Sequence, residues 1–205
     1  MILYLWWGRN PDWWEIALNN QLECVREIFK RVWTKEVLHL PFARTGIMKK
    51  NRDAFWSVAF QNFVESLWIV YKNAAYIEDI EEFSGDTIYM NGWNDCLFLL
   101  EMCLNPLLYS TLLRTKNIIG ESCWAVVLAK HFSSSKMDSR VDWLNLAKDS
   151  IIVPHYTERN RENKLLEGKE KYQTKYTIGI DETTFVKFEN WRYWDVIWLW
   201  NIHYL

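Results

Sequence analysis

Serine, histidine and glutamate side chains each follow an apolar run of this chain, at the point where the run ends. They are Ser122 after residues 117–119, His155 after residues 151–154, and the pair Asp181-Glu182 after residues 176–180. A serine hydroxyl is a poor nucleophile unless an imidazole takes its proton, and that imidazole needs a carboxylate to fix its tautomer. If the three runs are parallel strands, their carboxyl ends share one sheet edge, which would gather these groups. The pattern therefore predicts acyl transfer with Ser122, His155 and Glu182 as the catalytic residues.

The residues around Ser122 have the layout of a nucleophile elbow. The sequence Gly-Glu-Ser-Cys-Trp-Ala at 120–125 leads from the apolar run into a helix-like stretch at 125–129. A serine on such a sharp turn presents its hydroxyl above the sheet, beside the first N–H groups of the helix. The plain alternative is a serine that only caps the helix.

The remaining parts of the site also have candidates and alternatives. An oxyanion hole needs two backbone N–H groups. Cys123 can supply one, and the turn 91–94, with Gly92 and Trp93, can supply the other. His155 and Glu182 have plain readings as a loop histidine and a surface turn residue. The carboxylate could instead come from Asp138 or Asp142.

The elements that must position these groups follow from the hydrophobic pattern. Strands are expected at 2–5, 36–40, 69–71, 87–90, 117–119, 151–155 and 175–180, and helices at 12–32, 51–67, within 95–113, at 125–129 and at 158–171. This alternation predicts an α/β fold, a three-layer sandwich whose mainly parallel sheet has helices on both faces. Asn190-Trp191, between two strand-like runs, indicates a C-terminal β-hairpin. The length of 205 residues fits a single domain, 1–205.

Charge and cysteine content exclude several classes of protein. The net charge is −2 with both signs interspersed, so no basic surface for nucleic acid is expected. The stretch 95–113 is apolar but contains Glu101, Asn105 and Pro106, which argues against a membrane span. The four cysteines show no C-x-x-C spacing, so we expect reduced thiols, no metal site and a cytoplasmic protein. The start of the chain reads as a strand and not as a signal peptide.

Tryptophan occurs where glycine would be expected. The chain has 14 Trp and 7 Gly, whereas glycine averages roughly 7% of residues. Trp33 and Trp68 follow predicted helices at the place of a left-handed C-cap, and Trp191 follows Asn190 where Asn-Gly is the strongest hairpin signal. Two explanations stay open. The protein is rich in tryptophan, or its gene comes from a lineage that reads UGA as glycine and was translated with UGA as tryptophan.

Five stretches of the chain together resemble a known family. They are Leu40-Pro41-Phe42-Ala43, residues 85–94 (Gly-Asp-Thr-Ile-Tyr-Met-Asn-Gly-Trp-Asn), residues 120–125, Val153-Pro154-His155-Tyr156-Thr157 and Ile178-Gly179-Ile180-Asp181-Glu182. In this order they are similar to the peptidase E (aspartyl dipeptidase) and cyanophycinase-like serine peptidases of the class I glutamine amidotransferase-like superfamily. The resemblance extends from about Met1 to Phe188.

The resemblance implies a flavodoxin-like, class I glutamine amidotransferase-like sandwich that hydrolyses short peptides without a cofactor or metal. Carried over by position, it implies Ser122 as nucleophile, His155 as base and Glu182 as orienting carboxylate. Gly92, Trp93 and Cys123 would line the oxyanion hole. A preference of such relatives for N-terminal aspartate would require a cation, for which Arg44 and Arg159 are candidates. No oligomeric state is implied.

The chain departs from the family pattern at Trp93 and Trp124, where the family has glycine. Indoles at these positions could close the oxyanion turn and the pocket. The alternative to a peptidase is therefore a catalytically impaired or non-enzymatic binding domain of the same fold. Glutamine amidotransfer would require cysteine as the nucleophile, and Cys123 lies one residue too late.

Overall fold

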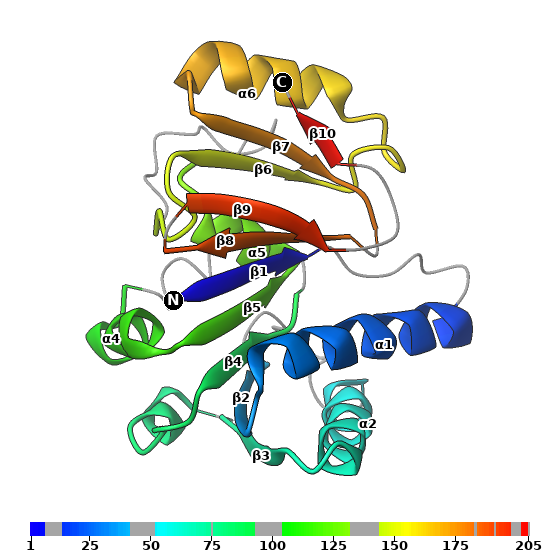
Figure 1. The fold of residues 1–205 in the computed structure, drawn as a ribbon, viewed down its shortest axis with the longest axis vertical. Helices are drawn as coiled ribbons and strands as arrows, with labels where there is room; N and C mark the ends of the chain where they lie inside the picture. Colours follow the sequence, from blue (N-terminus) through cyan, green and yellow to red (C-terminus); the bar gives the residue numbers. More distant parts are fainter. Residues whose placement is uncertain are drawn as a thin grey trace.

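The computed structural model describes residues 1–6, 14–41, 52–74, 76–92, 104–131, 144–182, 184–190, 192–197 and 202–204. Strands and helices alternate through most of this length (Figure 1). The predicted mainly parallel α/β fold is confirmed. Four residues named in the predictions for the site lie outside the described residues: Arg44, Trp93, Asp138 and Asp142.

A seven-stranded sheet forms the centre of the molecule. Its order is β3-β2-β4-β5-β1-β8-β9. The strands are β1 (Ile2–Trp6), β2 (Glu36–Leu40), β3 (Val70–Asn73), β4 (Thr87–Met90), β5 (Asn117–Glu121), β8 (Phe185–Glu189) and β9 (Arg192–Ile197). The first five strands of this order pair in parallel, and β8 and β9 add antiparallel strands. β8 and β9 form the expected C-terminal hairpin.

Helices cover both faces of this sheet. On one face, α1 (Trp14–Val32) and α2 (Arg52–Ser66) bury residues such as Ile28 and Phe60 against Val37, Tyr89 and Ile119. On the other face lie α4 (Pro106–Arg114), the short 3₁₀ helix η3 (Ile77–Ile80) and α5 (Cys123–Leu128). Pro106 begins α4 behind an Asn105 side chain that accepts the Leu107 N–H at 2.9 Å, a standard start for a helix.

A second sheet carries two of the predicted catalytic residues. β6 (Ser150–Pro154) and β7 (Tyr176–Ile180) pair in parallel, and β10 (Ile202–Tyr204) adds an antiparallel strand to β7. α6 (Glu162–Tyr172) covers this sheet, with Leu165 packed on Ile151 and Val153 (Figure 1). The expectation that one sheet edge gathers all three groups is therefore wrong, because β6 and β7 pair with each other and not with β5.

The α5 helix connects the two sheets. It packs against both β5 and β6, and its side chains share one buried cluster with Ile152, Ile178 and Ile180 of the second sheet. Past its end, the N–H groups of Lys130 and His131 each donate to the Ser150 carbonyl at 3.1 Å. Residues at the two ends of α5 are thus fixed to different sheets.

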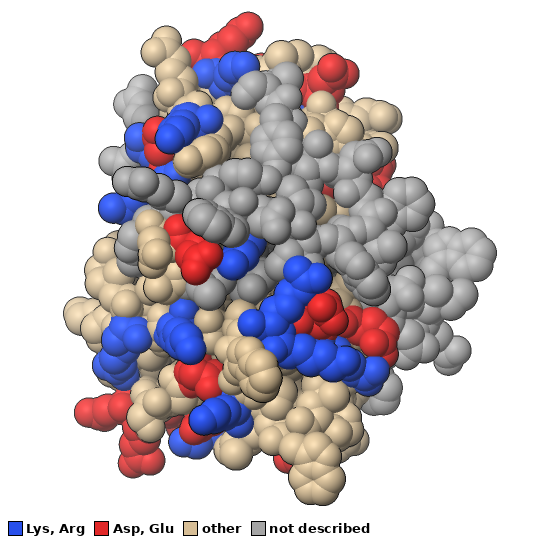
Figure 2. All heavy atoms as spheres, in the orientation of Figure 1, with Lys and Arg blue, Asp and Glu red and all other residues tan. Residues whose placement is uncertain are grey.

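Charged side chains of both signs are interspersed on the face that Figure 2 shows. Among the described residues, no helix is long and apolar enough to cross a bilayer.

Candidate active site

Ser122 occupies a sharp turn between β5 and α5. Its φ of 60° and ψ of −119° lie in a region that glycine normally occupies, so the backbone is strained. The Ser122 side chain makes no capping hydrogen bond to α5, which removes the simplest structural reason for a serine here. The strand, the turn and the helix lie where a nucleophile elbow requires them.

Gly92 packs directly against Ser122. A Cβ atom at position 92 would overlap the Ser122 Cβ, and it would lie 2.8 Å from the Ser122 Oγ and 2.6 Å from the Glu121 carbonyl oxygen. Only glycine permits this approach of the loop after β4 to the turn after β5. Gly92 and Cys123, two of the three residues predicted for the oxyanion hole, therefore both adjoin Ser122.

His155 and Glu182 form a hydrogen-bonded pair at the ends of β6 and β7. The His155 Nδ1 lies 2.8 Å from the Glu182 Oε1, with side-chain exposures of 6% and 14%. His155 has a φ of 46°, so its backbone is also in a left-handed conformation that is uncommon for histidine. Two of the residues that the sequence pattern selected are thus in direct contact.

Burial controls the protonation of this pair. Burial, with the nearby Arg159 and Arg161 guanidinium groups, lowers the pKa of His155 from 6.5 to about 2. The imidazole is therefore neutral at neutral pH and able to accept a proton. Burial also raises the pKa of Glu182, while Arg159 acts in the opposite direction. Arg159, a candidate from the sequence, thus lies near both groups.

Several polar residues around this pair were not selected from the sequence. Thr157 donates its N–H to the Asp181 Oδ1 at 2.9 Å, and Glu182 donates its N–H to the Glu158 Oε1 at 2.8 Å. The Arg161 Nη1 donates to the Pro154 carbonyl at 2.7 Å. Asp181 adjoins Glu182 in the sequence, and this acidic pair was the one sequence signal that pointed to a role for Asp181 near the site. The others depend on loop geometry that no spacing reveals.

Cys123 and Trp124 follow Ser122 in α5. Cys123 is disulfide-bonded, so the prediction of reduced cysteines is wrong for this residue, because folded proximity and not sequence spacing decides which thiols can pair. Cys24 is a buried free thiol. The Trp124 side chain is fully buried, and its Nε1 has no hydrogen-bond partner among the residues that the structure describes. A buried indole N–H normally finds a partner.

No cluster of His, Cys, Asp and Glu side chains that could hold a metal ion occurs in the part of the chain that the structure describes. The described residues of the site offer a serine hydroxyl, an imidazole and carboxylates.

Comparison with known proteins adds family information to this geometry. The family model of Peptidase family S51 matches residues 15–193. The structure is similar to a peptidase from an acI-B1 Actinobacterium, with a TM-score of 0.69, 21% identity, and coverage of 100% of this chain and 90% of that one. It is also similar to a putative peptidase E protein from Listeria monocytogenes EGD-e, with a TM-score of 0.62, 20% identity, and coverage of 100% and 98%. No curated protein matches the sequence.

Proposed function

The chain belongs to peptidase family S51, a family of serine peptidases, and we propose that it hydrolyses short peptides through an acyl-enzyme on Ser122. His155 acts as the base and Glu182 as the carboxylate that orients it. The observation that carries the proposal is the buried His155–Glu182 pair, whose Nδ1 and Oε1 atoms are 2.8 Å apart. A buried imidazole held by a carboxylate through one nitrogen keeps its other nitrogen for proton transfer.

The direction of α5 supports Ser122 as the nucleophile. The residues after α5 are hydrogen-bonded to the start of β6 through the Ser150 carbonyl, and α5 packs along β6. The opposite end of α5, with Ser122, is therefore directed toward the end of β6, with His155. The unused capping capacity of Ser122 and its strained backbone agree with a reactive role.

The proposed reaction has two steps. The Ser122 Oγ attacks the scissile carbonyl carbon while its proton moves to the His155 Nε2. The developing oxyanion accepts hydrogen bonds from the backbone N–H groups of Cys123 and of the turn at Gly92 and Trp93. The His155 proton then passes to the leaving amine as the C–N bond breaks. A water molecule next attacks the ester, again giving its proton to His155, which releases the acid and restores Ser122.

Negatively charged peptides are the proposed substrate class. Arg159 is exposed and lies close enough to His155 and Glu182 to affect the pKa of both. A guanidinium at this place can bind a substrate carboxylate. Replacing Arg159 with Gln should raise KM for dipeptides with an acidic side chain more than for their uncharged counterparts. Equal KM changes for the two series would argue against this role of Arg159.

Labelling with a serine-directed fluorophosphonate tests the nucleophile. The protein should be labelled and should hydrolyse short peptides, and Ser122→Ala should abolish both, with a loss of several orders of magnitude in rate. Ser110→Ala is the matched control, because Ser110 is exposed on α4. Labelling that survives Ser122→Ala would contradict the proposal.

The second candidate function is a binding domain with an impaired site. The buried Trp124 indole beside the elbow, whose Nε1 finds no partner in the described part of the chain, favours this alternative for the chain as it is written. A chain that is inert toward fluorophosphonate while correctly folded would support it.

A further inference from the structure

The loops that carry His155 and Glu182 are joined by two reciprocal hydrogen bonds. The Asp181 carboxylate, in the loop after β7, accepts the Thr157 N–H at 2.9 Å. The Glu158 carboxylate, in the loop after β6, accepts the Glu182 N–H at 2.8 Å. Each loop thus supplies a carboxylate to the backbone of the other, and the residues that make these bonds adjoin or include the members of the His155–Glu182 pair.

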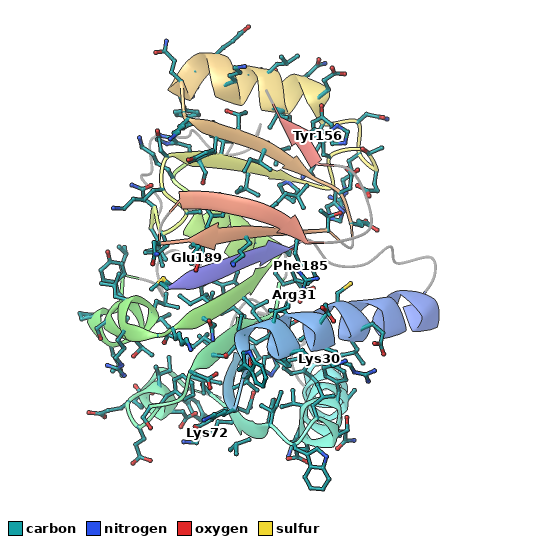
Figure 3. The ribbon with its side chains drawn as sticks, viewed as in Figure 1. Lys30, Arg31, Lys72, Tyr156, Phe185 and Glu189 are labelled. Carbon is teal, nitrogen blue, oxygen red and sulfur yellow. The ribbon has the colours of Figure 1, made fainter. Side chains whose placement is uncertain are left out.

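Asp181 has further contacts that fix the loop after His155. It is only 4% exposed, and its Oδ2 accepts from the Thr157 hydroxyl at 3.0 Å and lies 3.4 Å from the His203 Nε2. The His203 ring also stacks on Tyr156, with centroids 4.1 Å apart. Figure 3 places Tyr156 beside β10, the strand that carries His203.

This arrangement brings three carboxylates together. Burial raises the pKa of Glu182, and the neighbouring Asp181 raises it further. Partial burial is also the main cause that raises the pKa of Glu158, and Asp181 and Glu182 both add to it. Clustered carboxylates repel each other. Three carboxylates close together, beside the strained His155 backbone, are typical of a site whose geometry is held at an energetic cost.

We propose that Glu158 and Asp181 are positioning residues that hold the Glu182 carboxylate at hydrogen-bond distance from the His155 imidazole. This inference rests on the proposed function, in which that contact sets the tautomer of the base. Glu158 is the informative member, because the residue lies at the surface with only its carboxyl group partly buried, and because its bond goes to the Glu182 backbone. Its removal should therefore displace Glu182 without unfolding the protein.

The test compares Glu158→Ala with Glu158→Gln. The alanine variant loses the acceptor, whereas the amide oxygen of glutamine can still accept the Glu182 N–H. We expect kcat to fall roughly tenfold to a hundredfold in Glu158→Ala at little change in KM, and to recover largely in Glu158→Gln. Glu170→Ala, at an exposed position of α6, is the control and should behave as the unmodified protein.

A second readout does not require peptidase activity. The proton on the His155 Nδ1 should give a hydrogen-bonded resonance in the NMR spectrum of the free protein, assigned by its loss in His155→Gln. This resonance should shift or vanish in Glu158→Ala and persist in Glu158→Gln. An unchanged resonance in Glu158→Ala would overturn the positioning role. Hydrolysis that survives Ser122→Ala would instead overturn the proposed function and leave the NMR result valid.

A separate observation concerns the ends of α1 and α2. Trp33 has a φ of 55° and Trp68 a φ of 62°, and their side chains are 82% and 96% exposed. Trp33 donates to the Lys30 carbonyl at 3.3 Å, and the next residue, Thr34, donates to the Phe29 carbonyl at 3.0 Å. These two bonds define a Schellman motif with Trp33 at the C′ position, where glycine is strongly preferred.

Neither indole offers a compensating gain. A left-handed backbone is unfavourable for a residue with a side chain, and an indole that is almost fully exposed gains little from burial. Trp68 has the corresponding bond of its own helix end, since its N–H donates to the Glu65 carbonyl at 3.0 Å two residues past Ser66, the last residue of α2. We infer that positions 33 and 68 are glycine in the protein as its source cell makes it, through UGA codons read as glycine.

Two measurements test this inference. The gene should have UGA at both positions, and mass spectrometry of the native protein should find glycine there. UGG codons, or tryptophan in the native peptides, would overturn the inference.

Substitution provides the physical control. Trp33→Gly should raise the folded-to-unfolded ratio by roughly 5- to 30-fold, whereas Trp33→Ala should not, because alanine keeps the Cβ. Gln173→Gly is the matched control, since Gln173 ends α6 with a φ of 48°. A gain in Gln173→Gly without one in Trp33→Gly would mean that the indole stabilises its position, which would also contradict the inference.

Discussion

The Nδ1 atom of His155 and the Oε1 atom of Glu182 are 2.8 Å apart, although β6 and β7, which position them, are separated in the sequence by the helix α6. Replacing Glu182 with Gln should lower kcat by roughly three to four orders of magnitude, because an amide can stabilise the wrong tautomer and cannot stabilise the imidazolium. Steady-state hydrolysis of a dipeptide measures this. Glu189→Gln is the control. Glu189 pairs with Ile2, the first residue of β1, at the opposite end of the sheet from the elbow that follows β5 (Figure 3). A loss of less than tenfold in Glu182→Gln would argue against the assigned role.

The stability of the protein should depend on pH through His155. Its pKa is about 2 in the folded protein against 6.5 ordinarily, so below pH 6.5 the unfolded chain binds a proton that the folded protein does not. The free energy of unfolding should therefore decrease as the pH falls from 6.5 toward 3, and the decrease should be smaller in His155→Gln. Urea titrations at several pH values measure both. Parallel pH curves for the two proteins would contradict a neutral, buried imidazole.

Gly92→Ala should damage both folding and activity. The added methyl group would overlap the Ser122 Cβ, and either the loop after β4 or the elbow would have to move. We expect a destabilisation of about 1–3 kcal/mol and a loss of fluorophosphonate labelling. Thermal unfolding and labelling rates measure these effects. Full labelling at unchanged stability would mean that the two turns are not in contact.

Ser122→Gly should stabilise the protein while removing the nucleophile. At a φ of 60°, a serine costs about 1–3 kcal/mol relative to an unstrained residue, and glycine relieves most of this. Ser122→Ala keeps the Cβ and should not be stabilised. The difference in unfolding midpoint between the two variants isolates the backbone strain. Identical midpoints would show that no strain is stored at the elbow.

Trp124→Gly combined with Trp93→Gly should give a more active enzyme than the chain as written. The Trp124 indole is fully buried, and its Nε1 is unpaired as far as the described residues go. Its removal eliminates this polar group beside the elbow. Fluorophosphonate labelling and peptide turnover of the double variant measure the gain, and both should vanish on adding Ser122→Ala. Lower activity in the double variant would identify the indoles as functional parts of the site.

The local pattern of the sequence was sufficient for most elements. β2 at 36–40 and β4 at 87–90 have the predicted bounds, and the hairpin around Asn190 forms with a φ of 49° at that residue. Hydrophobic periodicity and turn chemistry act over a few residues, so such elements can be inferred from them. At the elbow, the left-handed φ belongs to Ser122 and not to Trp124, which stands at the glycine position of the family pattern.

The pairing of strands was not predictable in the same way. Nothing in residues 150–154 or 176–180 distinguishes a strand of the central sheet from one of a separate sheet, because both environments favour buried apolar runs. The acceptor role of Glu158 depends on the register between β6 and β7, in which Pro154 pairs with Ile180. Contacts of this kind are set by tertiary structure.

The division between two sheets has a consequence for how the site can fail. Ser122 is fixed by the seven-stranded sheet, whereas His155 and Glu182 belong to a three-stranded unit whose outer core, under α6, consists of a few side chains. A sub-global opening of β6, β7, β10 and α6 would separate the base from the nucleophile while the larger sheet stays folded. Amide hydrogen exchange should therefore be faster in β7 than in β4. Inactivation by mild denaturant should precede the loss of overall helical structure.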